Sequence, residues 1–60
     1  MYLFIKNVKG NYYYWNDVDK IWEGLKDNAT PLTKNQIDIL LKKASKLINK
    51  DEFSHIKVTN

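Results

Sequence analysis

The chain contains no cysteine and no arginine, and it has only one proline, two glycines and one histidine among its 60 residues. Without cysteine it cannot form a disulfide framework, a thiolate zinc site or a thiol nucleophile. A core must therefore come from its aromatic and aliphatic residues. No apolar run has the length of a signal peptide or the roughly 20 residues of a membrane helix. We therefore expect a cytoplasmic protein that does not enter a membrane.

Groups suited to catalysis are also scarce. His55 is the single histidine, and its neighbour Ser54 would point to the opposite side of a strand, so the two cannot easily act as a nucleophile and its base. Two glycines are too few for a glycine-rich phosphate loop, and Asp17-Val-Asp19 lacks the spacing of a calcium loop. We expect a protein that is not an enzyme and that needs no metal or cofactor.

The positive charge is concentrated in the second half of the chain. The net charge is +3, and residues 34–60 hold six Lys and three acidic residues, which accounts for the whole excess. A lysine ridge recurs there at helical spacing, formed by Lys42, Lys43, Lys46 and Lys50. Such a ridge can contact nucleic-acid phosphates, although it also suits a solvated helix end. The absence of arginine counts against readout of base sequence.

The first fifteen residues predict an aromatic β-hairpin. Asn7 and Gly10 suit the first and fourth positions of a type I turn, which favours a three-residue loop with a glycine bulge. That register places Leu3 opposite Trp15 and Ile5 opposite Tyr13. A two-residue turn at Gly10-Asn11 is the alternative, and it would move the side chains of the second strand to the other face.

The rest of the chain predicts two helices and a closing strand. Val18, Ile21, Trp22 and Leu25 stand at helical spacing and predict a first helix that begins after a cap at Asn16 or Asp17 and ends near Asp27. Asp19, Glu23 and Asp27 would form an acidic row along it. Thr33 and Gln36 form a capping box for a second helix from Lys34 to about Asn49. Alternation in residues 53–58 predicts a strand.

These elements give the order ββααβ in one domain, residues 1–60. The expected fold is α+β, with a three-stranded, mostly antiparallel sheet and two helices packed on one face. The expected core is Leu3, Ile5, Trp15, Val18, Ile21, Trp22, Leu25, Leu32, Ile37, Leu40, Leu41, Ala44, Leu47, Ile48, Ile56 and Val58.

The opposite sheet face would then carry exposed rings. The partner-binding residues that this arrangement predicts are Tyr2, Phe4, Tyr12, Tyr14, His55 and Lys57. Tyrosine is common at interface cores, so we expect a small binding protein that modulates or inhibits a protein partner. The alternatives are a nucleic-acid-binding regulator that uses the lysine ridge, a homodimer through the aromatic face, and an ordinary solvated sheet. The size and the lysine-rich composition are what we would expect of a phage or mobile-element protein.

Overall fold

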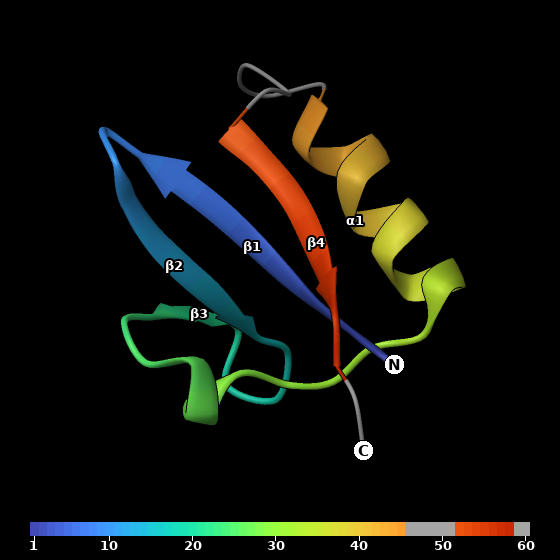
Figure 1. Ribbon diagram of the computed structural model, residues 1–60. Coiled ribbons are helices and arrows are strands. Elements are labelled where there is room, and N and C mark those ends of the chain that lie inside the picture. Colours follow the sequence, from blue (N-terminus) through green and yellow to red (C-terminus); the bar gives the residue numbers. More distant parts are fainter. Residues whose placement is uncertain (46–51, 59–60) are drawn as a thin grey trace.

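The structure is a computed structural model that describes residues 1–45 and 52–58 (Figure 1). Its sheet has four antiparallel strands in the spatial order β3-β2-β1-β4. One α-helix packs mainly against β1 and β4. The elements are β1 (Tyr2–Val8), β2 (Asn11–Asn16), β3 (Ile21–Glu23), the 3-10 turn η1 (Lys26–Asn28), α1 (Lys34–Ser45) and β4 (Phe53–Lys57).

This architecture corrects the expected fold. The chain is α+β, but the described residues form a four-stranded sheet with one α-helix, whereas the sequence predicted three strands and two helices. In Figure 1, α1 lies near the β4 edge of the sheet, and β3 and η1 lie near the opposite edge. The α-helix therefore leaves the β2–β3 half of the sheet largely uncovered.

The hairpin turn differs from both turns that the sequence suggested. Val8 pairs with Asn11, so Lys9 and Gly10 alone make the turn. Their φ angles are 52° and 87°. Two successive positive φ angles define a type I′ turn, whose twist matches that of the flanking strands. Asn7 still contributes, because its Oδ1 accepts a hydrogen bond of 2.9 Å from the Gly10 amide.

The register that follows from this turn changes which residues share a face. Ile5 pairs with Tyr14, one position away from the predicted Tyr13. Because side chains alternate along a strand, Trp15 lies on the same side of the sheet as Phe4. We call this side, which α1 covers in part, the helix side. Leu3, Ile5 and Tyr14 lie on the other side, which we call the open side because α1 does not pack there, although Leu3 and Ile5 are themselves buried.

The turn gives a direct test of this register. Replacing Gly10 with alanine is expected to lower the free energy of unfolding by about 1 kcal/mol, because an L-residue is strained at positive φ. Gly24 is the matched control, since its φ is not in the left-handed region and a Cβ there would meet no atom within 4 Å. Urea denaturation of both variants checks the prediction. Equal losses for Gly10→Ala and Gly24→Ala would contradict the turn.

The predicted first helix is wrong. Asn16 Oδ1 accepts hydrogen bonds from the amides of Val18 (3.0 Å) and Asp19 (2.9 Å), which closes a tight turn after β2. Lys20 then adopts a φ of 58°, so the chain reverses and β3 pairs with β2. The side-chain amide of Asn16 also donates to Glu23 Oε2 at 3.0 Å across the two strands. The hydrogen bonds of the Asn16 side chain to nearby backbone amides therefore stabilise a turn in place of the helix that the apolar spacing predicts.

The loss of this helix also corrects part of the predicted core. Val18, Ile21 and Leu25 are 80%, 48% and 67% exposed, so none of them is a core residue. The acidic row does not exist as a helix face, because Glu23 belongs to β3 and Asp27 to η1. The buried residues are Leu3, Phe4, Ile5, Leu32 and Ile37. Phe4 is the one among them that the sequence placed on a surface.

The second helix is confirmed at its start. The Thr33 amide donates to Gln36 Oε1 at 2.8 Å, and the Gln36 amide donates to Thr33 Oγ1 at 3.3 Å, which is the reciprocal capping box. Leu32 and Ile37 meet in the core cluster, as the predicted hydrophobic staple requires. The predicted core residues Leu47 and Ile48 lie outside the described residues.

Candidate functional site

The six predicted partner-binding residues do not share one surface. Phe4 is buried beneath α1. The register of β1 and β4 places Tyr2, His55 and Lys57 on the helix side with Phe4, and the Tyr2 and His55 rings meet edge to face at 5.4 Å. Tyr12 and Tyr14 lie on the open side. The expected continuous aromatic face is therefore split between the two sides of the sheet.

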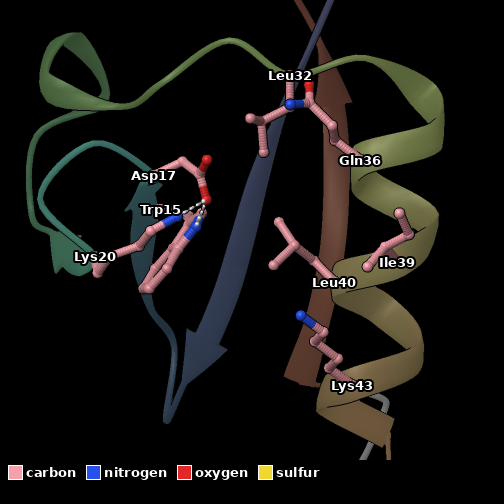
Figure 2. A pocket seen from close by; sticks show the side chains of 8 residues that line it. All are labelled: Trp15, Asp17, Lys20, Leu32, Gln36, Ile39, Leu40 and Lys43. Atoms are coloured by element: carbon pink, nitrogen blue, oxygen red, sulfur yellow. Dashed lines mark hydrogen bonds and ion pairs between the residues drawn. The ribbon is translucent and has the colours of Figure 1, made fainter.

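The lysine ridge is described only in part. Lys42 and Lys43 are exposed residues of α1, whereas Lys46 and Lys50 lie outside the described residues. Lys43 extends from α1 toward the Trp15 side, as Figure 2 shows. It therefore borders a feature that the sequence did not predict.

That feature is a groove between α1 and the β2 end of the sheet (Figure 2). Two adjoining cavities of about 430 Å³ and 230 Å³ make it up, and both are lined by Trp15, Leu40 and Lys43. We call it the tryptophan groove. Its larger cavity is also lined by Asp17, Lys20, Leu32, Gln36 and Ile39, and its smaller one by Phe4, Trp22, Ala44 and Phe53.

A cluster of rings forms the floor of the groove. Trp15 and Trp22 are paired across β2 and β3, and their ring centroids lie 5.1 Å apart. Trp22 also lies 5.6 Å from Phe4, which stacks on Phe53 at 5.7 Å with an interplanar angle of 9°. Both tryptophans remain only half-buried. The floor is therefore lined by aromatic rings and partly open to solvent.

The entry to α1 is held against this floor by backbone hydrogen bonds. The amide of Thr30 donates to the Trp15 carbonyl at 3.1 Å. Tyr2 and Leu32 exchange two backbone bonds of 2.8 Å and 2.7 Å. These bonds tie residues 30–32 to the ends of β2 and β1, so the first turn of α1 starts beside Trp15. The position of the groove is thus set by the sheet itself.

Charged groups lie at one end of the groove, around Asp17. Its Oδ1 accepts hydrogen bonds from Lys20 Nζ and from Trp15 Nε1, each at 3.0 Å. The Lys20 hydrogen bond, followed by that of Trp15, lowers the pKa of Asp17 from its ordinary value. The Asp17 amide in turn donates to Thr30 Oγ1 at 2.8 Å. The carboxylate fixes the orientation of the Trp15 ring and is itself neutralised by Lys20.

The lowered pKa of Asp17 predicts a pH-dependent contribution to stability. A carboxyl whose folded-state pKa is depressed stabilises the fold above its unfolded pKa of about 3.9, and this stabilisation is lost as the pH falls through the folded value. We expect Asp17→Asn to lower the free energy of unfolding at pH 7 and to have a smaller effect at about pH 3. Urea denaturation at both pH values measures this difference.

Asp27→Asn is the control for that experiment, because it makes the same change of net charge at an exposed site on η1. A difference between wild type and Asp17→Asn that stays constant or grows toward acid pH would contradict the assigned hydrogen bonds.

The sequence does not predict the tryptophan groove, because the two sides of the groove come from distant segments. Its pattern places Trp15 on a sheet face and Trp22 on a helix, both in a closed core. The hydrogen bonds that join Asp17 to Lys20 and Trp15 depend on the turn after β2. The helical spacing of residues 18–25 predicts a helix there and no such turn. The aromatic pair Trp15 and Trp22 would have been a usable signal, since cross-strand aromatic pairs are typical of antiparallel strands.

Within residues 1–45 and 52–58, no cluster of three His, Asp or Glu side chains is placed to hold a metal ion. No helix in the same ranges is long and apolar enough to cross a membrane. No family model, no curated protein and no solved structure matches the chain.

Proposed function

We propose that this protein is a non-enzymatic binding protein that modulates a partner protein by receiving a segment of it in the tryptophan groove. The observation that supports this proposal is the half-buried pair Trp15 and Trp22 beside α1, which forms the floor of two adjoining cavities. Tryptophan is one of the residues enriched among interface hot spots, which a partner covers completely on binding.

The rim of the groove indicates the chemistry of the partner segment. Lys20 and Lys43 line the larger cavity, and Asp17 is the only acidic residue there. Because Asp17 is bound to Lys20 and Trp15, it offers little to a positively charged ligand. Apolar side chains would fill the cavities, and acidic side chains would pair with Lys43. A segment that combines both types fits this site.

A protein segment suits the floor better than nucleic-acid bases. Base stacking needs open ring faces. The face of Trp22 already carries Lys6 Nζ at 4.6 Å from its centroid, and Phe4 and Phe53 stack on each other. These contacts weigh against the nucleic-acid-binding alternative.

Site-specific photo-crosslinking in the cell that produces the protein tests the proposal. A benzophenone amino acid replaces Ile39, which is 53% exposed and lines the larger cavity. The matched control carries it in place of Tyr12, which is 54% exposed and lies on the open side. The lysate is treated with nuclease, and the crosslinked peptide is sequenced by mass spectrometry.

We expect a protein adduct from position 39 only, joined to a segment rich in apolar and acidic residues, and lost when Lys43 is replaced with glutamate. Three results would overturn the proposal: no adduct at position 39, a nucleic-acid adduct there, or equal adducts from positions 39 and 12. An adduct with a second copy of the chain from position 12 alone would support the homodimer instead.

A further inference from the structure

We infer, on the basis of the proposed function, that the partner segment is an acidic amphipathic α-helix that lies beside α1 over β2 and β3. Its apolar side chains would enter the two cavities of the tryptophan groove from successive helical turns. Its acidic side chains would face Lys43. The occupant would lie over the part of the sheet on which residues 1–45 and 52–58 place no α-helix.

The dimensions of the sheet leave room for one more helix. Strands lie about 4.8 Å apart, so four strands span about 19 Å. A helix with its side chains is about 10 Å wide, so one helix covers about two strands. In this chain α1 packs mainly on β1 and β4. Figure 1 shows the β2–β3 half of the sheet beside it without an α-helix. The uncovered half has the width of a single helix.

The two cavities follow one another along α1. From α1, the larger cavity is lined by Gln36, Ile39, Leu40 and Lys43, and the smaller one by Leu40, Lys43 and Ala44. They share Leu40 and Lys43, and the larger one extends back to Gln36 while the smaller one extends on to Ala44. Residues i and i+4 of a second helix that runs alongside α1 rise by about 6 Å. Two apolar side chains at that spacing can occupy both cavities at once.

Backbone hydrogen bonding favours a helix over an extended peptide. An extended segment on this floor would place its amide and carbonyl groups against Trp15, Trp22 and Leu40, which offer almost no partners for them. Unpaired backbone groups that lose contact with water are costly. An α-helix satisfies its backbone hydrogen bonds internally. It can therefore lie on a ring-lined floor without that cost.

The charge of α1 argues against a second copy of this helix as the occupant. Lys34, Lys42 and Lys43 against Asp38 give α1 a net charge of 3 − 1 = +2. Two such helices side by side would repel each other. A helix whose flanks carry glutamate or aspartate would instead meet a lysine-lined rim. The occupant is thus a helix of a different protein that carries negative charge.

A peptide-display experiment tests this inference with three libraries of equal length and apolar content. One has apolar residues at helical spacing with Glu and Asp elsewhere. The second has the same apolar pattern with Lys in place of the acids. The third has acidic residues with apolar residues at alternate positions, the pattern of a strand. Each library is selected on the wild-type protein, on Ile39→Asp and on Tyr12→Thr.

We expect enrichment of the acidic helical library alone, with binding of its best members weakened about tenfold or more by Ile39→Asp and unchanged by Tyr12→Thr. Proline placed in the middle of a selected peptide should abolish its binding. Enrichment of the strand-patterned or the lysine library, enrichment of none, or equal loss with Tyr12→Thr would overturn the inference. The crosslinking experiment distinguishes failure of this inference from failure of the proposed function. An adduct from position 39 to an extended segment would support the proposed function and would contradict the helical conformation of the partner segment.

Discussion

Replacing Ile37 with alanine is expected to unfold most of the protein at room temperature. Ile37 is fully buried and packs with Leu32 and Phe4 at the centre of the core. Truncating a buried isoleucine to alanine typically costs about 2–5 kcal/mol. A chain of this length has a small stability reserve, since a domain of about 60 residues buries only about 60% of its unfolded surface. Thermal unfolding followed by circular dichroism measures the loss.

Ile39 provides the matched control for this substitution. It lies two residues further along α1 and is 53% exposed, so Ile39→Ala should change the free energy of unfolding by less than about 0.5 kcal/mol. Similar losses for Ile37→Ala and Ile39→Ala would show that α1 does not present the face described here to the sheet.

The second large effect is expected on binding. Replacing Lys43 with glutamate should weaken the association with an acidic partner segment about tenfold or more, which corresponds to about 1.4 kcal/mol. Lys43 lines both cavities, so its reversal places a negative charge beside Asp17 and opposite the acidic side chains of the partner. Isothermal titration calorimetry with a selected peptide, at low and at high salt, measures the change.

Lys9→Glu makes the same change of net charge in the turn between β1 and β2, away from the groove. It should alter the affinity only slightly, and raising the salt concentration should reduce the difference between the two variants. Equal weakening by Lys9→Glu and Lys43→Glu would mean that the net charge of the protein, and not the rim of the groove, attracts the partner.

The parts of the fold that the sequence predicted correctly depend on short-range signals. The capping box of Thr33 and Gln36, the start of α1 at Lys34 and the contact between Leu32 and Ile37 each involve residues a few positions apart. The alternation of residues 53–58 likewise identified β4, which ends one residue earlier at Lys57. Such signals survive folding because the groups that satisfy one another are already neighbours in the chain.

The parts that failed depend on choices between nearly equal local patterns. Residues 18–25 have helical spacing, yet the side chain of Asn16 and the positive φ of Lys20 turn the chain into β3. The hairpin register depended on which residues form the turn, and a shift by one position moved Trp15 from the side of Leu3 to that of Phe4. The tryptophan groove follows from both outcomes, so no single segment of the sequence could reveal it.

The tryptophan groove is the proposed binding surface, and one titration tests this proposal most directly. The protein is labelled with ¹⁵N and at isoleucine methyl groups, and a peptide selected from the acidic helical library is added during an NMR experiment. Trp15 and Trp22 are the only tryptophans, so their two indole N–H signals report on the floor of the groove. The methyl groups of Ile39 and Ile56 report on the groove and on the open side.

We expect the chemical shifts of both indole signals and of the Ile39 methyl signal to change with peptide concentration until they reach a plateau. The chemical shift of the Ile56 methyl signal should stay constant. Indole signals that do not move, or a shift confined to Ile56 and the other side chains of the open side, would contradict the proposal.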